Sequence, residues 1–235
     1  MLNMRHLLFI GVAMSCFGGV VQTAAATPIN LVQNGSFEDG LTFYTTTGGG
    51  DYPVSVIVTD GVTGSAFGEA IPSDPLITGS PDEGRLHAAY FVDDVAHQTL
   101  IQTIFLPVGT YEIGFDAYNP LNGYNNPNDA TFTGSIAGVN LANYSVKSSP
   151  VATWTSFNGL ATITAAGNYL VSFDFAPMGF MASGNAQAAD VVIDRVYVIA
   201  SDRTGGTPIP EPITLSLFGA GLICAGAVRR RKKLA

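Results

Sequence analysis

The chain has 235 residues, and only 12% of them are charged. Glycine and the β-branched and aromatic residues are common, a mixture that favours strands joined by turns. Basic residues gather at the two ends, so residues 27–207 keep four of them against seventeen acidic residues and carry a net charge of −13. Such a body excludes nucleic acid as a partner, because phosphate binding needs a basic face. Cys16 and Cys224 also lie in the ends, which leaves the middle without a disulfide or a thiol nucleophile.

Residues 1–26 have the features of a secretory signal peptide. Arg5 supplies the positive start, residues 7–21 are apolar, and Ala24 and Ala26 place small side chains at the −3 and −1 positions. We therefore expect signal peptidase to cleave before residue 27 and the rest of the chain to be exported. Lipoprotein anchoring at Cys16 is the alternative, although the residues before it match that signal poorly.

Two segments of the middle alternate strictly between apolar and polar residues, at 110–117 and 168–175. Both follow the pattern Gly-x-Tyr-x-aliphatic-x-Phe-Asp, so we expect them to be neighbours or counterparts in a two-sheet fold. Turns rich in Gly, Asn and Pro separate further predicted strands. These strands are 54–59, 86–92, 99–106, 135–141 and 191–199. The pattern predicts an all-β, two-sheet antiparallel sandwich over residues 27–202.

The polar and aromatic stretch 118–129 is the main candidate for a ligand site. Sugars are bound by flat ring faces beside amide and carboxylate groups, and this stretch supplies both. Its candidate side chains are Tyr118, Tyr124, Asn125, Asn126 and Asp129. Further aromatic rings are available at Tyr44, Tyr52, Tyr90 and Trp154. An ordinary solvated loop is the alternative, because Asn, Gly and Pro are turn residues.

Motifs of catalysis are missing from the sequence, which contains neither Gly-x-Ser-x-Gly nor His-Glu-x-x-His. His87 and His97 are the only histidines after the leader, and neither stands in a recognisable nucleophilic arrangement. We therefore expect no enzyme. Hydrolysis of a glycan or ester stays open as an alternative, since a pair of catalytic carboxylates leaves no local signature.

Three pieces of the middle resemble galactose-binding-like jelly rolls, a group that includes several carbohydrate-binding module families. They are the opening Leu-Val-Gln-Asn-Gly-Ser-Phe-Glu-Asp-Gly at 31–40, the segment 98–111 and the closing segment 190–196. The resemblance implies a jelly roll with a structural calcium ion held by Glu38 and Asp194. Asp194 shares a predicted strand face with Val192, Val196 and Val198, and an inward face would bury it and require a partner. Alternatively, Glu38 caps a turn, and Asp194 pairs with Arg195 or backbone N–H groups. No cofactor is required otherwise.

A linker at 203–207 leads into a three-part tail at 208–235. The tail contains the Pro-Glu-Pro motif, an apolar segment at 213–228 and a basic cluster at 229–233. As a helix with about 1.5 Å per residue, the apolar segment would span roughly 24 Å, short of a bilayer core of about 30 Å. The basic cluster favours the cytoplasmic side, so a temporary anchor is expected. The motif and cluster residues are Pro210, Glu211, Pro212, Arg229, Arg230 and Arg231.

The tail resembles the PEP-CTERM sorting domain, which implies recognition and cleavage by exosortase, a membrane protease. An ordinary tail anchor is the alternative. The sequence thus predicts an exported bacterial protein that passes through an inner-membrane intermediate to the cell surface or the extracellular polysaccharide matrix of a biofilm. Its expected activity is non-catalytic polysaccharide binding. A structural surface protein without a small ligand is the first alternative, and a weak hydrolase is the second.

Overall fold

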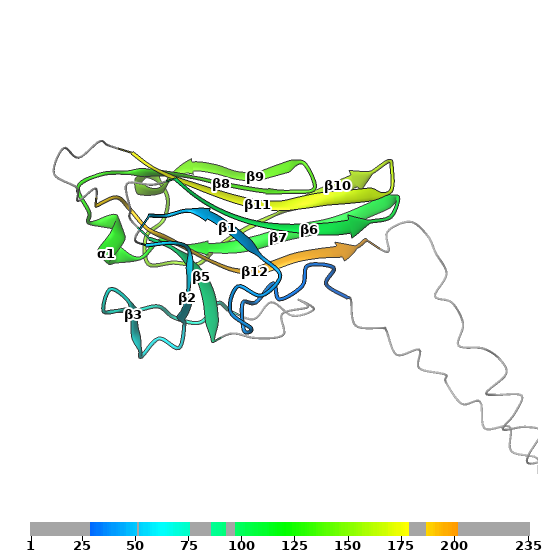
Figure 1. The fold of residues 1–235 in the computed structure, drawn as a ribbon. Coiled ribbons are helices and arrows are strands. Elements are labelled where there is room, and N and C mark those ends of the chain that lie inside the picture. Colours follow the sequence, from blue (N-terminus) through cyan, green and yellow to red (C-terminus); the bar gives the residue numbers. More distant parts are fainter. Residues whose placement is uncertain (1–28, 51, 76–85, 93–96, 179–186, 202–235) are drawn as a thin grey trace, which may run out of the picture.

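A computed structural model describes residues 29–50, 52–75, 86–92, 97–178 and 187–201. These residues form two five-stranded antiparallel sheets, stacked as the two layers of a sandwich (Figure 1). Almost every regular element is a strand. The all-β sandwich predicted from the sequence is therefore confirmed.

Sheet A has the strand order β1–β6–β11–β8–β9, and sheet B has the order β10–β7–β12–β5–β2. The strands of sheet A are β1 Thr45–Gly48, β6 Gln98–Leu106, β11 Gly167–Pro177, β8 Ala130–Ile136 and β9 Val139–Ser145. Those of sheet B are β10 Thr155–Ile163, β7 Gly109–Tyr118, β12 Val191–Ala200, β5 His87–Phe91 and β2 Ser55–Val58. The remaining elements are the hairpin of β3 Gly64–Ala66 and β4 Glu69–Ala70, helix α1 Leu121–Tyr124 and the 3₁₀ turn Val146–Ser148.

The two alternating segments are β7 and β11, and they belong to different sheets. Their apolar faces point into the core, where Phe115 of β7 packs edge-on against Phe173 of β11 with ring centroids 4.9 Å apart. They are therefore counterparts across the core, one of the two arrangements that the shared pattern predicted.

The predicted strand at 135–141 is wrong, because this segment contains the turn between β8 and β9. Ala137 and Gly138 adopt φ values of 51° and 80° there, which reverses the chain in two residues. Strands β1, β3, β4 and β10 were not predicted. The other predicted strands correspond to β2, β5, β6 and β12.

The outer face of sheet B is covered by residues 59–75, which we call the covering segment. Ala66 and Ile71 of this segment join a second apolar cluster with Tyr90 of β5 and Tyr118 of β7. Figure 1 shows β3, within the covering segment, on the side of sheet B that faces away from β8 and β9. The covering segment thus buries the outer face of sheet B around Tyr90 and Tyr118, whereas the edge strand β10 keeps exposed residues.

The N-terminal segment 30–35 pairs with β12 beyond the residues of β12 that pair with β5. The backbone N–H of Leu31 donates to the carbonyl of Val198 at 2.8 Å, and that of Val196 donates to the carbonyl of Gly35 at 2.9 Å. Among the described residues, no helix is long and apolar enough to cross a membrane. The predicted apolar segment 213–228 lies outside the described residues.

Candidate functional site

An aromatic hollow of about 440 Å³ opens on the outer face of sheet B. Its floor comes from β2 and β5, and its walls come from the chain before β2 and from the β3–β4 hairpin. The lining residues are Tyr52, Pro53, Ser55, Ile57, Gly64, Ser65, Phe67, Gly68, Tyr90 and Val92.

Three aromatic rings form the corner of this hollow. Phe67 stands between the other two, with its centroid 6.2 Å from that of Tyr52 at 67° and 6.4 Å from that of Tyr90 at 64°. Tyr52 is 52% exposed and Phe67 is 60% exposed, whereas Tyr90 is buried. The hydroxyl of Tyr90 donates to the Asp190 carboxylate at 2.6 Å, which fixes the floor of the corner. The rings of Tyr52 and Phe67 are therefore open to a ligand, and the ring of Tyr90 beneath them is fixed.

Phe67 occupies a costly position. It lies at the tip of the β3–β4 hairpin with φ at 48°, followed by Gly68 with φ at 86°. A two-residue turn with two positive φ values favours Asn or Gly, and a bulky residue in the left-handed region costs roughly 1–2 kcal/mol. The chain thus holds a large apolar ring in solvent and in a strained conformation. Such strain tends to persist where a side chain serves a function.

The stretch 118–129 braces this hairpin from the side. Glu69, on β4, accepts hydrogen bonds from the backbone N–H groups of Leu121 at 3.0 Å and Asn122 at 2.7 Å. The side chain of Asn122 donates to the carbonyl of Phe67 at 3.2 Å. Helix α1 therefore supports the wall of the hollow.

The five residues predicted to bind a ligand in this stretch do not meet in one site. Tyr118 is 4% exposed and packs under Trp154 with centroids 5.3 Å apart, and burial together with the charge of Glu69 raises its pKa. Asp129 accepts hydrogen bonds from the backbone N–H groups of Ala130 at 2.7 Å and Lys147 at 2.9 Å. Tyr118 and Asp129 therefore stabilise the fold, through packing and through backbone hydrogen bonds respectively.

The other three predicted residues lie near the surface of the same stretch. The Tyr124 hydroxyl donates to the carbonyl of Lys147 at 3.2 Å, and the Asn126 amide donates to that of Ala188 at 2.7 Å. Asn125 is exposed just after α1. Ligand binding by this set stays a prediction, whereas the hollow offers a better aromatic surface.

Only part of the aromatic corner was predictable from the sequence. Tyr52 and Tyr90 were among the further aromatic candidates, and Trp154 proves to cover Tyr118. Tyr44 packs on Phe37 with centroids 5.1 Å apart, and its hydroxyl is buried, so it belongs to the core. Phe67 was missed. Its signal was the dipeptide Phe-Gly between the short segments Gly-Ser-Ala and Glu-Ala, which marks a hairpin tip with an apolar residue where Asn is usual.

The two predicted calcium ligands have separate environments. Glu38 accepts hydrogen bonds from the backbone N–H groups of Leu86 at 2.7 Å and His87 at 3.1 Å, and from the His87 ring at 2.9 Å. Asp194 is fully buried and accepts a hydrogen bond from the backbone N–H of Arg195 at 2.7 Å. A polar hollow of about 250 Å³ beside β12 is lined by Glu38 but not by Asp194.

The strand face expected for Asp194 needs a correction. A β-bulge at Arg195, where φ is 50°, shifts the register of β12 against β7. Val192 therefore packs in the cluster outside sheet B, whereas Val196 packs in the main core. Among the described residues, no group of three or more His, Cys, Asp or Glu side chains could hold a metal. Calcium at Glu38 and Asp194 therefore stays a prediction.

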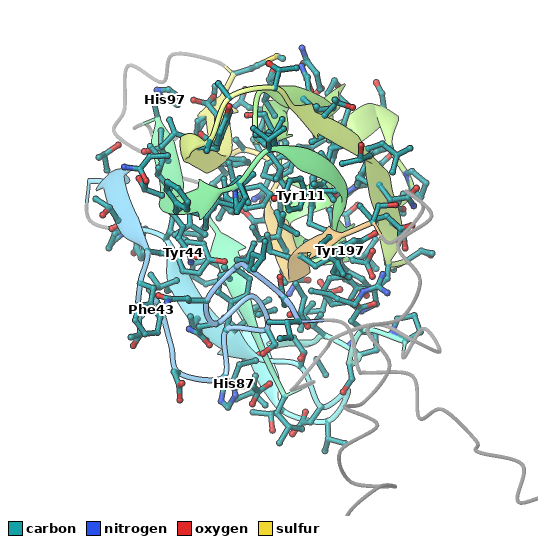
Figure 2. All side chains as sticks on the ribbon, turned by 90° about the vertical axis from the view of Figure 1, so that its right-hand side faces the viewer. Phe43, Tyr44, His87, His97, Tyr111 and Tyr197 are labelled. Carbon is teal, nitrogen blue, oxygen red and sulfur yellow. The ribbon has the colours of Figure 1, made fainter. Side chains whose placement is uncertain are left out.

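The two histidines are far apart. Figure 2 shows His87 and His97 at opposite ends of the molecule. His87 contacts Glu38, and the Nε2 of His97 lies within hydrogen-bond distance of Asp174 Oδ2, at 2.7 Å. They cannot act together in one site. The predicted processing residues at 24, 26, 210–212 and 229–231 lie outside the described residues.

Comparison with known proteins identifies the tail. Residues 208–232 match the PEP-CTERM protein-sorting motif. This match confirms the resemblance noted in the sequence, and the motif implies export and sorting to the cell surface. No curated protein matches the chain.

Solved structures similar to the chain include two carbohydrate-binding modules. TmCBM61, solved in complex with β-1,4-galactotriose, has 18% identity and a TM-score of 0.45, and the match covers 74% of this chain and 99% of that one. The CBM22-2 xylan-binding domain of Xyn10C from Paenibacillus barcinonensis has 10% identity and a TM-score of 0.36, with coverage of 71% and 98%. The enzymatically active domain of bacteriophage CBA120 tailspike protein 4 has 17% identity and a TM-score of 0.43. That match covers 74% of this chain and 22% of that one.

Proposed function

We propose that this chain is a surface-sorted bacterial protein whose sandwich binds polysaccharide in the aromatic hollow without catalysis. The observation that carries the proposal is Phe67, an exposed ring held in a strained conformation between Tyr52 and Tyr90. The apolar C–H faces of a sugar ring fit such a corner, because they remove both exposed aromatic faces from water. The described lining residues carry no charge, so the hollow suits a neutral sugar.

Binding should be measured on the chain from residue 27 onward, kept in mild detergent. Affinity electrophoresis against a panel of neutral and acidic polysaccharides would select a ligand, and calorimetry would give its Kd. We expect Tyr52→Ala and Phe67→Ala each to raise Kd roughly tenfold, the effect of losing about 1.4 kcal/mol at a central aromatic contact.

Phe105→Ala is the matched control. Phe105 is an equally exposed phenylalanine, but it lies on β6 in sheet A. Its loss should leave Kd unchanged. Retention of no polysaccharide would favour a structural surface protein without a small ligand. Release of new reducing ends during incubation would instead support a hydrolase.

We further propose that the chain is delivered to the extracellular polysaccharide matrix of a biofilm. Signal peptidase would remove residues 1–26, and an exosortase-type protease would act at the tail. A polysaccharide-binding domain on such a protein would hold it in the matrix after release. A released domain that washes freely from an intact biofilm would contradict this role.

Calcium at Glu38 and Asp194 remains a separate proposal. An ion that binds only the folded protein raises its stability, by about 2.7 kcal/mol at a hundredfold excess over Kd. Thermal unfolding of the same chain in excess calcium and in chelator would test it. Equal melting temperatures would contradict calcium binding and leave the proposal for the aromatic hollow unaffected.

A further inference from the structure

Arg195 is buried where the covering segment meets sheet B. It is 4% exposed and lies at the bulge of β12. Its Nε forms an ion pair with Asp74 Oδ2 at 3.2 Å, and its Nη2 donates to Asp116 Oδ2. Both carboxylates are buried as well. A buried arginine between two carboxylates is strongly constrained, because each charge needs its partner.

The two carboxylates belong to different parts of the fold. Asp116 is on β7, inside sheet B, and Arg195 also reaches the hydroxyl of Ser156 on β10 at 3.2 Å. Asp74 instead lies near the end of the covering segment, after the hairpin that carries Phe67. The Arg195–Asp74 pair is therefore a link between the sheet and the segment, whereas the Arg195–Asp116 pair lies within the sheet.

Other contacts near Asp74 hold the same stretch of chain. The indole N–H of Trp154 donates to the carbonyl of Pro72 at 2.8 Å, and Ile71 is fully buried. Phe67, farther out on the hairpin, is mostly exposed. The base of the segment is thus held by the sheet, and its tip is held by the contacts of helix α1 with Glu69 and Phe67.

We propose that the Arg195–Asp74 pair is a positioning device that docks the covering segment and so places Phe67 in the hollow. The inference rests on the proposed polysaccharide function for its consequence in binding. The docking itself can be measured without a ligand. Trp154 is the only tryptophan of the chain, and its hydrogen bond to residue 72 reports whether the segment is in place.

Two isosteric variants separate this role from a general structural one. Asp74→Asn removes the charge on the segment and leaves Arg195 paired one-to-one with Asp116. Asp116→Asn removes a charge of the same sign inside the sheet and keeps the link to Asp74. Both are made in the chain from residue 27 onward, and both leave one arginine with one carboxylate.

We expect hydrogen exchange of the Trp154 indole N–H to accelerate in Asp74→Asn and to stay as in the wild type in Asp116→Asn. If the fraction of molecules with the covering segment docked on sheet B falls to about one tenth, the apparent Kd for the selected polysaccharide rises about tenfold. Unchanged exchange and Kd in Asp74→Asn would overturn the proposal. Equal changes in both variants would also overturn it, because they would indicate a charge cluster that serves stability alone. Accelerated exchange in a protein that binds no polysaccharide would retain the docking role and remove the proposed function.

Discussion

Phe115 is the residue around which the two sheets meet. Its ring contacts Phe173, stacks on Phe157 with centroids 5.2 Å apart, and lies over Gly134 of β8. A Cβ at Gly134 would stand 2.4 Å from the tip of that ring. The glycine therefore sets the distance between the sheets at this point, since interiors are packed without spare volume.

Gly134→Ala should destabilise the domain by about 1–3 kcal/mol, the usual cost of forcing extra volume into a packed core. Thermal or urea unfolding would measure the change. Gly167→Ala is the matched control, because Gly167 starts β11 and a Cβ there would meet no atom within 4 Å. Equal stability of the two variants would show that the core yields at Phe115.

Glu38 ties the N-terminal loop to the start of β5. Burial alone would raise its pKa, but hydrogen bonds from the His87 ring and from the backbone N–H groups of Leu86 and His87 outweigh that effect. The pKa therefore lies below its ordinary value of 4.5. A carboxyl group with a lowered pKa in the folded state contributes stability above its unfolded pKa and loses it as the pH falls through the folded pKa.

The melting temperature of Glu38→Gln should therefore lie below that of the wild type above pH 4.5, and the difference should shrink as the pH falls further. Calorimetry across this range would measure it. Asp39→Asn is the control, since the neighbouring Asp39 side chain is exposed and forms no hydrogen bond or ion pair with another described residue. A Glu38→Gln difference that persists unchanged at low pH would contradict the assignment.

At the scale of elements, stability and binding place opposite demands on the β3–β4 hairpin. Phe67→Asn should stabilise the hairpin by up to about 1 kcal/mol, because Asn tolerates the left-handed region better than Phe does. The same change should weaken polysaccharide binding by removing an open ring. Unfolding curves and calorimetric Kd values on one preparation would measure both effects. A stabilised variant with wild-type affinity would place the binding surface elsewhere.

The sequence predicts the strands whose side chains alternate strictly between apolar and polar. It does not predict the turns and strands whose position depends on backbone conformation. The segments that became β7 and β11 have one apolar face each, so they were recognisable. The turn at Ala137 was not, because alanine rarely adopts a positive φ and so gives no turn signal. β10 was missed since its Asn158-Gly159 pair is typical of a turn.

The candidate site was predictable only in part, because its geometry also depends on backbone conformation. Tyr52 and Tyr90 could be proposed as free aromatic rings, but their meeting with Phe67 depends on a hairpin of two very short strands. The bulge at Arg195 was equally hidden, and it changes which residues of β12 face the core. Strand periodicity assumes an unbroken register, so one extra residue reverses every later assignment.

At the scale of the whole molecule, the sandwich and the tail have separate tasks. The sandwich forms the aromatic hollow, and residues 208–232 contain the sorting motif. The apolar segment 213–228 has 16 residues and as a helix would span roughly 24 Å, against a bilayer core of about 30 Å. Because this length is short and five basic residues follow, we expect a temporary stop in the membrane.

Replacement of Pro210, Glu211 and Pro212 by alanine should therefore trap the chain in the membrane at full length. In a bacterium that has an exosortase, the wild-type chain should lose its tail and appear outside the membrane fraction. Fractionation with intact-mass measurement would follow both forms. Alanine at 204–207, just before the matched motif, is the control of equal kind and should leave processing unchanged. Release of the triple variant with its tail removed, as in the wild type, would show that the motif does not direct cleavage, and the tail would then be an ordinary anchor cut by another protease.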